Sequence, residues 1–197
     1  MTPDFGSFLR LFGATIKNPA AVARQITALR WPHQIGWMGL IATSAITVLM
    51  IHGVLMLFGV SEMEGVRVAA PLADGVINFA SSVITIFIIY YAGRAFGGTG
   101  SFGATLLIMT WFNAVAMVLL GIMFITALIV PGLTIFVAFG AVAVTFYCLA
   151  HFLNELHGFN SLLKAIGLFI MSVCGILLGM AVILALISGG AAMGAAT

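Results

Sequence analysis

The sequence predicts an all-α protein, a polytopic bundle of membrane-spanning helices, and three observations support this prediction. Of its 197 residues, 63% are hydrophobic and only 6% are charged, whereas soluble domains carry roughly 25% charged residues. The chain contains five apolar stretches near the ~20 residues that a helix needs to cross a bilayer. These stretches are too long for the roughly ten-residue strands of a membrane barrel, so they predict helices.

Residues 1–34 precede the first apolar stretch and predict two short amphipathic helices. Asn18-Pro19 offers an N-cap and a first-turn proline for the second of them. We expect both helices to lie in the headgroup region of the membrane; the alternative is that they pack on the bundle as a lid. The first helix is indicated by apolar residues at helical spacing, which are Phe5, Phe8, Leu9, Phe12 and Ile16.

Residues 35–197 predict one membrane domain of five transmembrane helices. A polar segment ending at Asp74 separates the first two, and the glycine-rich turn at 97–103 separates the second from the third. Val130-Pro131-Gly132 divides the next apolar run into a hairpin, because proline disfavours helix in the residue before it and glycine permits the reversal. The expected spans cover about residues 35–60, 75–96, 104–129, 133–153 and 162–187.

The positions of lysine and arginine predict the orientation of the chain. Loops that carry these residues tend to stay in the cytoplasm, and five spans leave only Arg67 on the opposite side. We therefore expect a cytoplasmic N-terminus and an external C-terminus, with no cleaved signal peptide. The residues that share the cytoplasmic side are Arg10, Lys17, Arg24, Arg30, Arg94 and Lys164.

Composition also argues against several classes of function. A net charge of +2 is too small to indicate nucleic-acid binding. Cys148 and Cys174 both fall within predicted spans, so they do not indicate a disulfide framework. No cofactor or structural metal follows from the sequence.

Three polar residues are expected at membrane depth. His52 lies in the first span, Asn78 in the second and Asn113 in the third. Polar groups at this depth face a partner helix or a cavity. Interhelical hydrogen bonding, which contributes about 0.6 kcal/mol for each bond, is the simpler interpretation; a substrate or proton path is the other.

Two further patterns have ordinary structural explanations. His151, Glu155 and His157 could bind a metal, but they lack the spacing of a metalloprotease motif and lie at a water-facing end. Residues 98–103 match the spacing of a dinucleotide fingerprint, but they join two membrane helices and therefore indicate a tight turn. Gly175 and Gly179 could allow close packing within the bundle or in a homo-oligomer.

The chain resembles the Yip domain family, five-span proteins named for interaction with Ypt/Rab GTPases. Three segments carry the resemblance, in the same order and spacing: Lys17-Asn18-Pro19, the turn at 97–101, and 154–159 with Lys164-Ala165. Eukaryotic members have a long N-terminal region, so the short segment here is similar to the bacterial branch. The resemblance implies an inner-membrane location and no established catalytic residues.

We therefore expect a non-enzymatic membrane organiser, a scaffold or assembly partner, that contacts the lipid bilayer and another membrane protein or complex. The alternative is a small transporter, channel or lipid-translocating protein with a polar path near His52, Asn78 and Asn113. An enzyme that uses the His151 cluster is the least favoured hypothesis. The expected cytoplasmic contact surface consists of Arg10, Lys17, Arg24, Arg30, Glu155 and His157.

Overall fold

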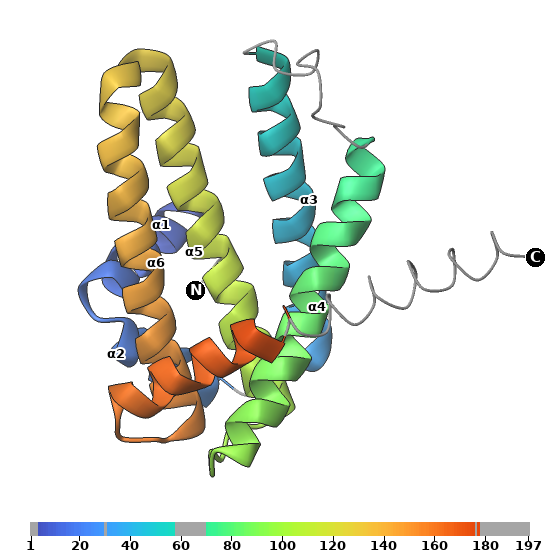
Figure 1. Ribbon diagram of the computed structural model, residues 1–197, viewed down its shortest axis with the longest axis vertical. Coiled ribbons are helices and arrows are strands. Elements are labelled where there is room, and N and C mark those ends of the chain that lie inside the picture. The colour runs from blue at the N-terminus through green and yellow to red at the C-terminus, as the bar shows by residue number, and fades with distance from the viewer. Residues whose placement is uncertain (1–3, 30, 58–69, 176, 178–197) are drawn as a thin grey trace, which may run out of the picture.

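The computed structural model describes residues 4–29, 31–57, 70–175 and 177. Within these residues the chain is helical throughout, and four helices are long and apolar enough to cross a membrane. They run alternately up and down in Figure 1. The prediction of a helical membrane bundle is confirmed. The four spanning helices are α3 (His33–Leu57), α4 (Pro71–Ala95), α5 (Phe102–Ile129) and α6 (Thr134–His157).

The four helices define two ends of the bundle. We call the end where α3 and α5 begin and α4 and α6 finish the base, and the opposite end the tip (Figure 1). At the tip, Val130 ends α5 and a single 3₁₀ turn, η2 (Pro131–Leu133), leads into α6, which confirms the predicted hairpin. At the base, Gly158 adopts a left-handed φ of 63° that ends α6.

The N-terminal segment forms two short helices, as the sequence predicts. They are α1 (Phe5–Lys17) and α2 (Pro19–Ala28), and Asn18 caps the second by accepting a 3.0 Å hydrogen bond from the Ala21 amide. Both helices pack against the bundle, as in the lid arrangement (Figure 1). The apolar face of α2 is buried, so it is used in packing within the protein.

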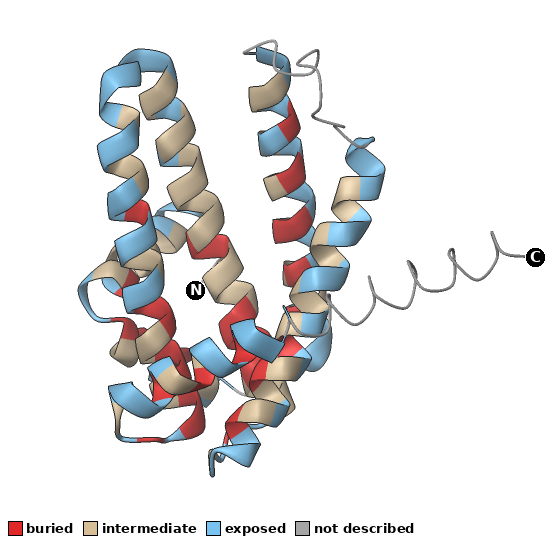
Figure 2. Cartoon of the chain, in the orientation of Figure 1, coloured by how far each residue is buried: buried red, intermediate tan, exposed pale blue. Residues whose placement is uncertain are grey.

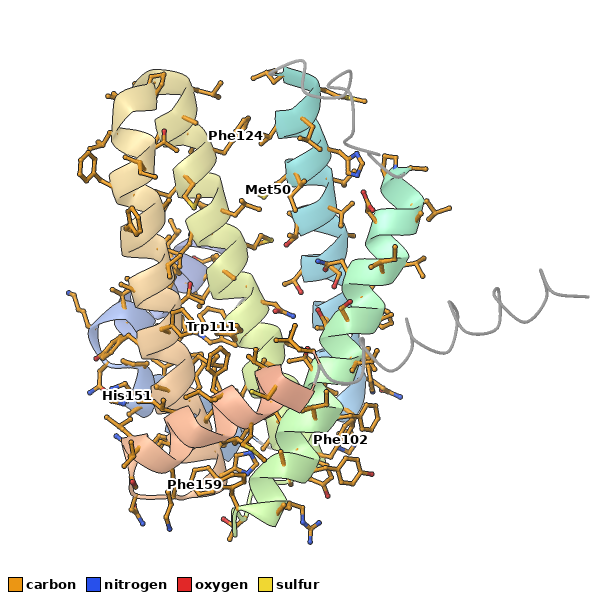
Figure 3. All side chains as sticks on the ribbon, in the orientation of Figure 1. Met50, Phe102, Trp111, Phe124, His151 and Phe159 are labelled. Carbon is orange, nitrogen blue, oxygen red and sulfur yellow. The ribbon has the colours of Figure 1, made fainter. Side chains whose placement is uncertain are left out.

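Trp111 on α5 anchors α1 to the bundle (Figure 3). Its indole Nε1 donates a 3.0 Å hydrogen bond to the hydroxyl of Thr15, and its ring meets Phe8 edge-on at 5.6 Å. Thr15 is fully buried. Trp111 lies nine residues into α5, about 13 Å along the helix axis at the usual rise. The anchor on α1 therefore meets α5 about two and a half turns in from its base end.

Buried residues concentrate at the base, while the tip is exposed to its surroundings (Figure 2). The core there joins α2 through the last described helix, and large apolar side chains on the outer faces remain exposed. Such exposure is expected of a bundle surrounded by lipid, because lipid tails are as apolar as the side chains. The packed base is therefore the part of the protein that holds the helices together.

The last described helix differs from the predicted fifth span. It runs over Leu162–Gly175, and we call it the crossing helix because it lies across the bundle near the base instead of alongside the spans (Figure 1). Its buried face, which consists of Ala165, Leu168 and Ser172, rests on the bundle. The remainder of the predicted span except Leu177, including Gly179, lies outside the described residues. Five spans and an external C-terminus therefore remain predictions.

Candidate functional site

Three spanning helices bring the predicted intramembrane polar residues together. Asn78 and Asn113 line one cavity of about 250 Å³ between α3, α4 and α5. Asn78 also lines a neighbouring cavity of about 260 Å³, together with His52 and Asp74. Because Asn78 borders both cavities, the side chains form a continuous series, which we call the polar line. Its remaining polar members are Thr43, Ser44, Thr47, Ser81 and Ser82.

The end of the polar line nearest the tip holds a hydrogen-bonded pair. His52 is buried near the end of α3, and its Nε2 lies 2.8 Å from Oδ2 of Asp74. The contact is an ion pair when the imidazole is protonated and a neutral hydrogen bond otherwise. The sequence places Asp74 in the loop before the second span, whereas the structure places it in the first turn of α4. This difference adds a carboxylate to the site.

The polar line extends from the tip to the middle of the bundle. Asp74 lies three residues into α4 and Asn78 seven, about 5 and 10 Å along the axis at 1.5 Å per residue. Asn113 lies eleven residues into α5, about 17 Å from the base on the same reckoning. The line therefore reaches roughly the centre of the membrane-spanning region.

Apolar side chains close the base side of the polar line. Leu40, Ile86 and Leu106 each lie one or two helical turns nearer the base than the polar residues on the same helix, and each is at most 1% exposed. All three belong to the main core cluster. We call them the apolar seal, because they are buried apolar side chains on all three helices on the base side of Asn113.

Glycines make the close contact of α3 and α5 beside the polar line possible. A Cβ on Gly36 would lie 2.7 Å from Leu106 Cγ, and one on Gly39 would lie 2.7 Å from Thr110 Cγ2. The same approach allows the Thr110 hydroxyl to donate a 3.1 Å hydrogen bond to the Gly36 carbonyl. Small residues that let backbones approach are typical of membrane helix interfaces. The backbones of α3 and α5 are therefore closely packed near the seal.

One hydroxyl in the polar line has no partner among the described residues. Ser44 Oγ is buried and forms no hydrogen bond there. In water-free surroundings an unpaired hydroxyl is costly, so a cavity-lining oxygen of this kind favours occupation by water or by a polar ligand.

The sequence contains a signal for the additional members of the site. Asp74, Asn78 and Ser82 recur four residues apart on α4, and Ser44 precedes His52 by eight on α3. Such spacing places side chains on one helix face. A search for polar stripes within apolar helices could therefore have found Asp74 and the hydroxyls, which single-residue inspection missed.

Only some residues of the predicted cytoplasmic contact surface are exposed. Arg10, Lys17 and Arg24 are exposed. Arg24 donates a 2.7 Å hydrogen bond to Glu155 and so ties α2 to α6. Arg30 lies outside the described residues.

His157 is buried, with 1% of its surface exposed, and the prediction that it offers a contact surface is wrong. Three glycines cradle its ring from the ends of other elements: Gly93, Gly98 and Gly100. Phe159 stacks on the ring at 5.3 Å, and the His157 carbonyl accepts a 3.1 Å hydrogen bond from the Thr99 amide. The sequence around His157 does not indicate this burial, because the glycines that enclose its ring lie far away in the chain.

The three candidate metal ligands near the end of α6 do not converge. His151 packs edge-on against Tyr147, Glu155 binds Arg24, and His157 turns into the base. In the part of the chain that the structure describes, no group of three or more His, Cys, Asp or Glu side chains could hold a metal ion. Cys148 and Cys174, also within the described residues, are free thiols.

Four apolar spanning helices, three of which enclose a polar line, define an integral membrane protein of the polytopic helical class. A model of the Yip1 domain matches residues 13–184. The chain therefore belongs to the Yip1 domain family, as its motifs indicate. Comparison with curated proteins gives no match, and comparison with solved structures gives none.

Proposed function

We propose that this protein binds a polar group within the membrane and lets it move along the polar line, as a small transporter, channel or lipid-translocating protein. The observation that carries the proposal is the convergence of His52, Asn78 and Asn113, from three helices, on two cavities that share Asn78. Polar side chains that face a common cavity at membrane depth mark substrate and ion pathways. No chemical step is needed for this role, so we propose no enzymatic activity.

The apolar seal suggests how the protein could control passage. We therefore propose that the polar line opens toward the tip and is closed near the base, where Leu40, Ile86 and Leu106 are buried. A pathway that is open on one side only corresponds to one state of an alternating-access protein. Movement of α3 and α4 relative to α5 would be needed to open the base side.

Orientation in the membrane is part of the proposal. With the N-terminus in the cytoplasm of a cell whose inner membrane holds the protein, the base faces the cytoplasm and the polar line opens to the outside. Two basic residues lie near the base and support this orientation: Arg24, which pairs with Glu155 near the end of α6, and Arg94 in the last turn of α4. An external C-terminus would require a fifth crossing after Gly158.

Flux through reconstituted vesicles tests the proposed function. We expect the wild-type protein to accelerate either the exchange of headgroup-labelled phospholipids between leaflets or the entry of a small polar solute. Replacing Asn78 and Asn113 together by leucine should slow that process about tenfold, equivalent to about 1.4 kcal/mol, because two polar positions become hydrocarbon. Val76→Leu is the control, since Val76 is 61% exposed on the lipid-facing side of α4. Equal rates in wild-type and protein-free vesicles, in both assays, would contradict the proposal.

A second function, that of a membrane organiser, is supported by one observation. Arg10 and Lys17 are exposed and seven residues apart on α1, so they lie on one helix face while Trp111 holds that helix in place. A fixed basic face suits an acidic segment of another membrane protein. Recovery of a stoichiometric protein partner in mild detergent, lost when Arg10 and Lys17 are replaced by glutamine, would favour this function over the first.

A further inference from the structure

A groove that is separate from the polar line lies between α6 and the crossing helix. Its volume is about 480 Å³. Most of its lining residues are apolar, and they include Phe146 and Leu149 on α6 and Leu162, Ile166 and Phe169 on the crossing helix. The groove is built from a membrane-spanning helix, so its natural surroundings are lipid chains rather than water.

The groove becomes polar along one stripe of α6. Tyr147, His151 and Glu155 recur four residues apart and therefore share a helix face. Tyr147 and His151 line the groove, with their rings edge-on at 4.8 Å, and Figure 3 labels His151 on α6 near the base. Glu155 follows at the base, where it binds Arg24. The stripe thus passes from aromatic to charged over about 12 Å.

The cation at the base end of the stripe can bind an anionic group. The Arg24 side chain is 60% exposed although it pairs with Glu155, so several of its N–H donors remain free to bind a second acceptor. Guanidinium groups bind phosphate oxygens through pairs of parallel hydrogen bonds. His151, half-buried beside them, can donate one more.

We propose that this groove binds one phospholipid, with an acyl chain between α6 and the crossing helix and its phosphate at Arg24 and His151. The side chains follow the order of groups in a phospholipid. Phe146, Ile166 and Phe169 offer an apolar surface to an acyl chain, Tyr147 and His151 are polar, and Arg24 supplies a cation for the phosphate. A bilayer lipid has the same order of groups and is always present at this depth. The proposal is independent of the polar line, which α3, α4 and α5 form on other helix faces.

The role of such a lipid would be to hold the crossing helix in place. Only one face of that helix is buried in the bundle, and Ile166 and Ile170, which border the groove, are 44% and 54% exposed. An acyl chain in the groove would cover these side chains and bridge them to α6. The crossing helix would then be joined to the bundle partly through lipid.

Native mass spectrometry of the full chain tests the acyl-chain part of the proposal. The protein would be reconstituted in vesicles of equal parts phosphatidylethanolamine and phosphatidylglycerol and extracted in mild detergent. We expect one retained phospholipid per chain, and about tenfold less in Ile166→Trp, whose larger ring fills the groove. Ile170→Trp blocks the same groove from another position and should behave alike if the first variant fails to fold.

A matched control uses the other side of the same helix. Met171 is 56% exposed and does not line the groove, so Met171→Trp adds the same side chain to the crossing helix and should retain lipid like the wild type. Equal retention by the folded groove variants and by this control would overturn the proposal. Absence of any retained lipid in the wild type would do so as well.

Two substitutions separate phosphate binding from the ion pair. Both Arg24→Gln and Glu155→Gln remove the ion pair between α2 and α6, but only the first removes the cation. We expect Arg24→Gln to lower lipid retention severalfold and Glu155→Gln to leave it unchanged or higher, since Arg24 is then free. Equal losses in both variants would show that the pair acts only on packing and would overturn the phosphate assignment.

Discussion

Replacing Gly93 by alanine is expected to destabilise the protein by about 1–3 kcal/mol, the usual cost of over-packing a core. A Cβ at this position would overlap the imidazole of His157, which is 1% exposed and cannot move into open space. Gly98 and Gly100 enclose the same ring from the neighbouring turn. The measurement is the free energy of unfolding in detergent micelles under reversible conditions.

The predicted clash can be tested by removing its second partner. His157→Ala should itself be destabilising because it leaves a cavity beside Phe159, but in the double variant the alanine at 93 has room. We expect a favourable coupling of about 0.5–3 kcal/mol between the two substitutions. Gly140→Ala is the control, since no atom lies within 4 Å of its added Cβ. If Gly93→Ala and Gly140→Ala were equally stable, the close packing at the base would be refuted.

Replacing Asp74 by leucine is expected to cost about 1–3 kcal/mol of stability. The substitution leaves the buried Nε2 of His52 without its 2.8 Å partner, and an unpaired buried polar group costs this much. Asp74→Asn keeps an acceptor at the same place and should cost less. Unfolding free energies of the two variants, measured side by side, give the comparison.

The double variant decides whether the pair stabilises the fold or serves the polar line. Replacing His52 and Asp74 together by leucine should restore most of the lost stability, because removing both partners of a buried hydrogen bond can be nearly neutral. Under the proposed function, the same variant should still show reduced flux. A double variant as unstable as Asp74→Leu alone would show that the pair's own contacts are not the cause.

The sequence predicts those features of the fold that depend on composition and local turn chemistry. Hydropathy locates the four spans, Pro131 marks the α5–α6 hairpin, and Asn18-Pro19 marks the start of α2. Each of these is encoded within a few residues, so no tertiary information is needed. The family assignment also follows from short motifs, and the match over residues 13–184 confirms it.

Features that depend on which helix faces meet could not be predicted. The spans are apolar on all sides and give no amphipathic direction to read. The burial of His157 depends on Gly93 and Gly98, more than fifty residues earlier in the chain. The lid-like docking of α1 depends on Thr15 meeting Trp111, and the direction of the crossing helix on its packing at the base.

The sequence indicates His52, Asn78 and Asn113 as polar residues at membrane depth, but it does not indicate that they line two adjoining cavities. The residues lie on three helices, and only their relative rotation makes Asn78 border both cavities. The sequence predicts a loop at Asp74, because helix ends are the least certain boundaries in a sequence. Its position in the first turn of α4 is what brings a carboxylate to His52.

The central claim is that the polar line is open to water from the tip and closed at the base, and thiol labelling from each side measures this most directly. Single cysteines at Asn78, Asn113 and Val76 would be placed in protein whose Cys148 and Cys174 are replaced by alanine. A small water-soluble thiol reagent should modify positions 78 and 113 from the tip side only, and leave position 76 unmodified, because thiols ionise in water and not in lipid. If positions 78 and 113 were as unreactive as position 76 from both sides, the polar line would be dry and the account would be contradicted.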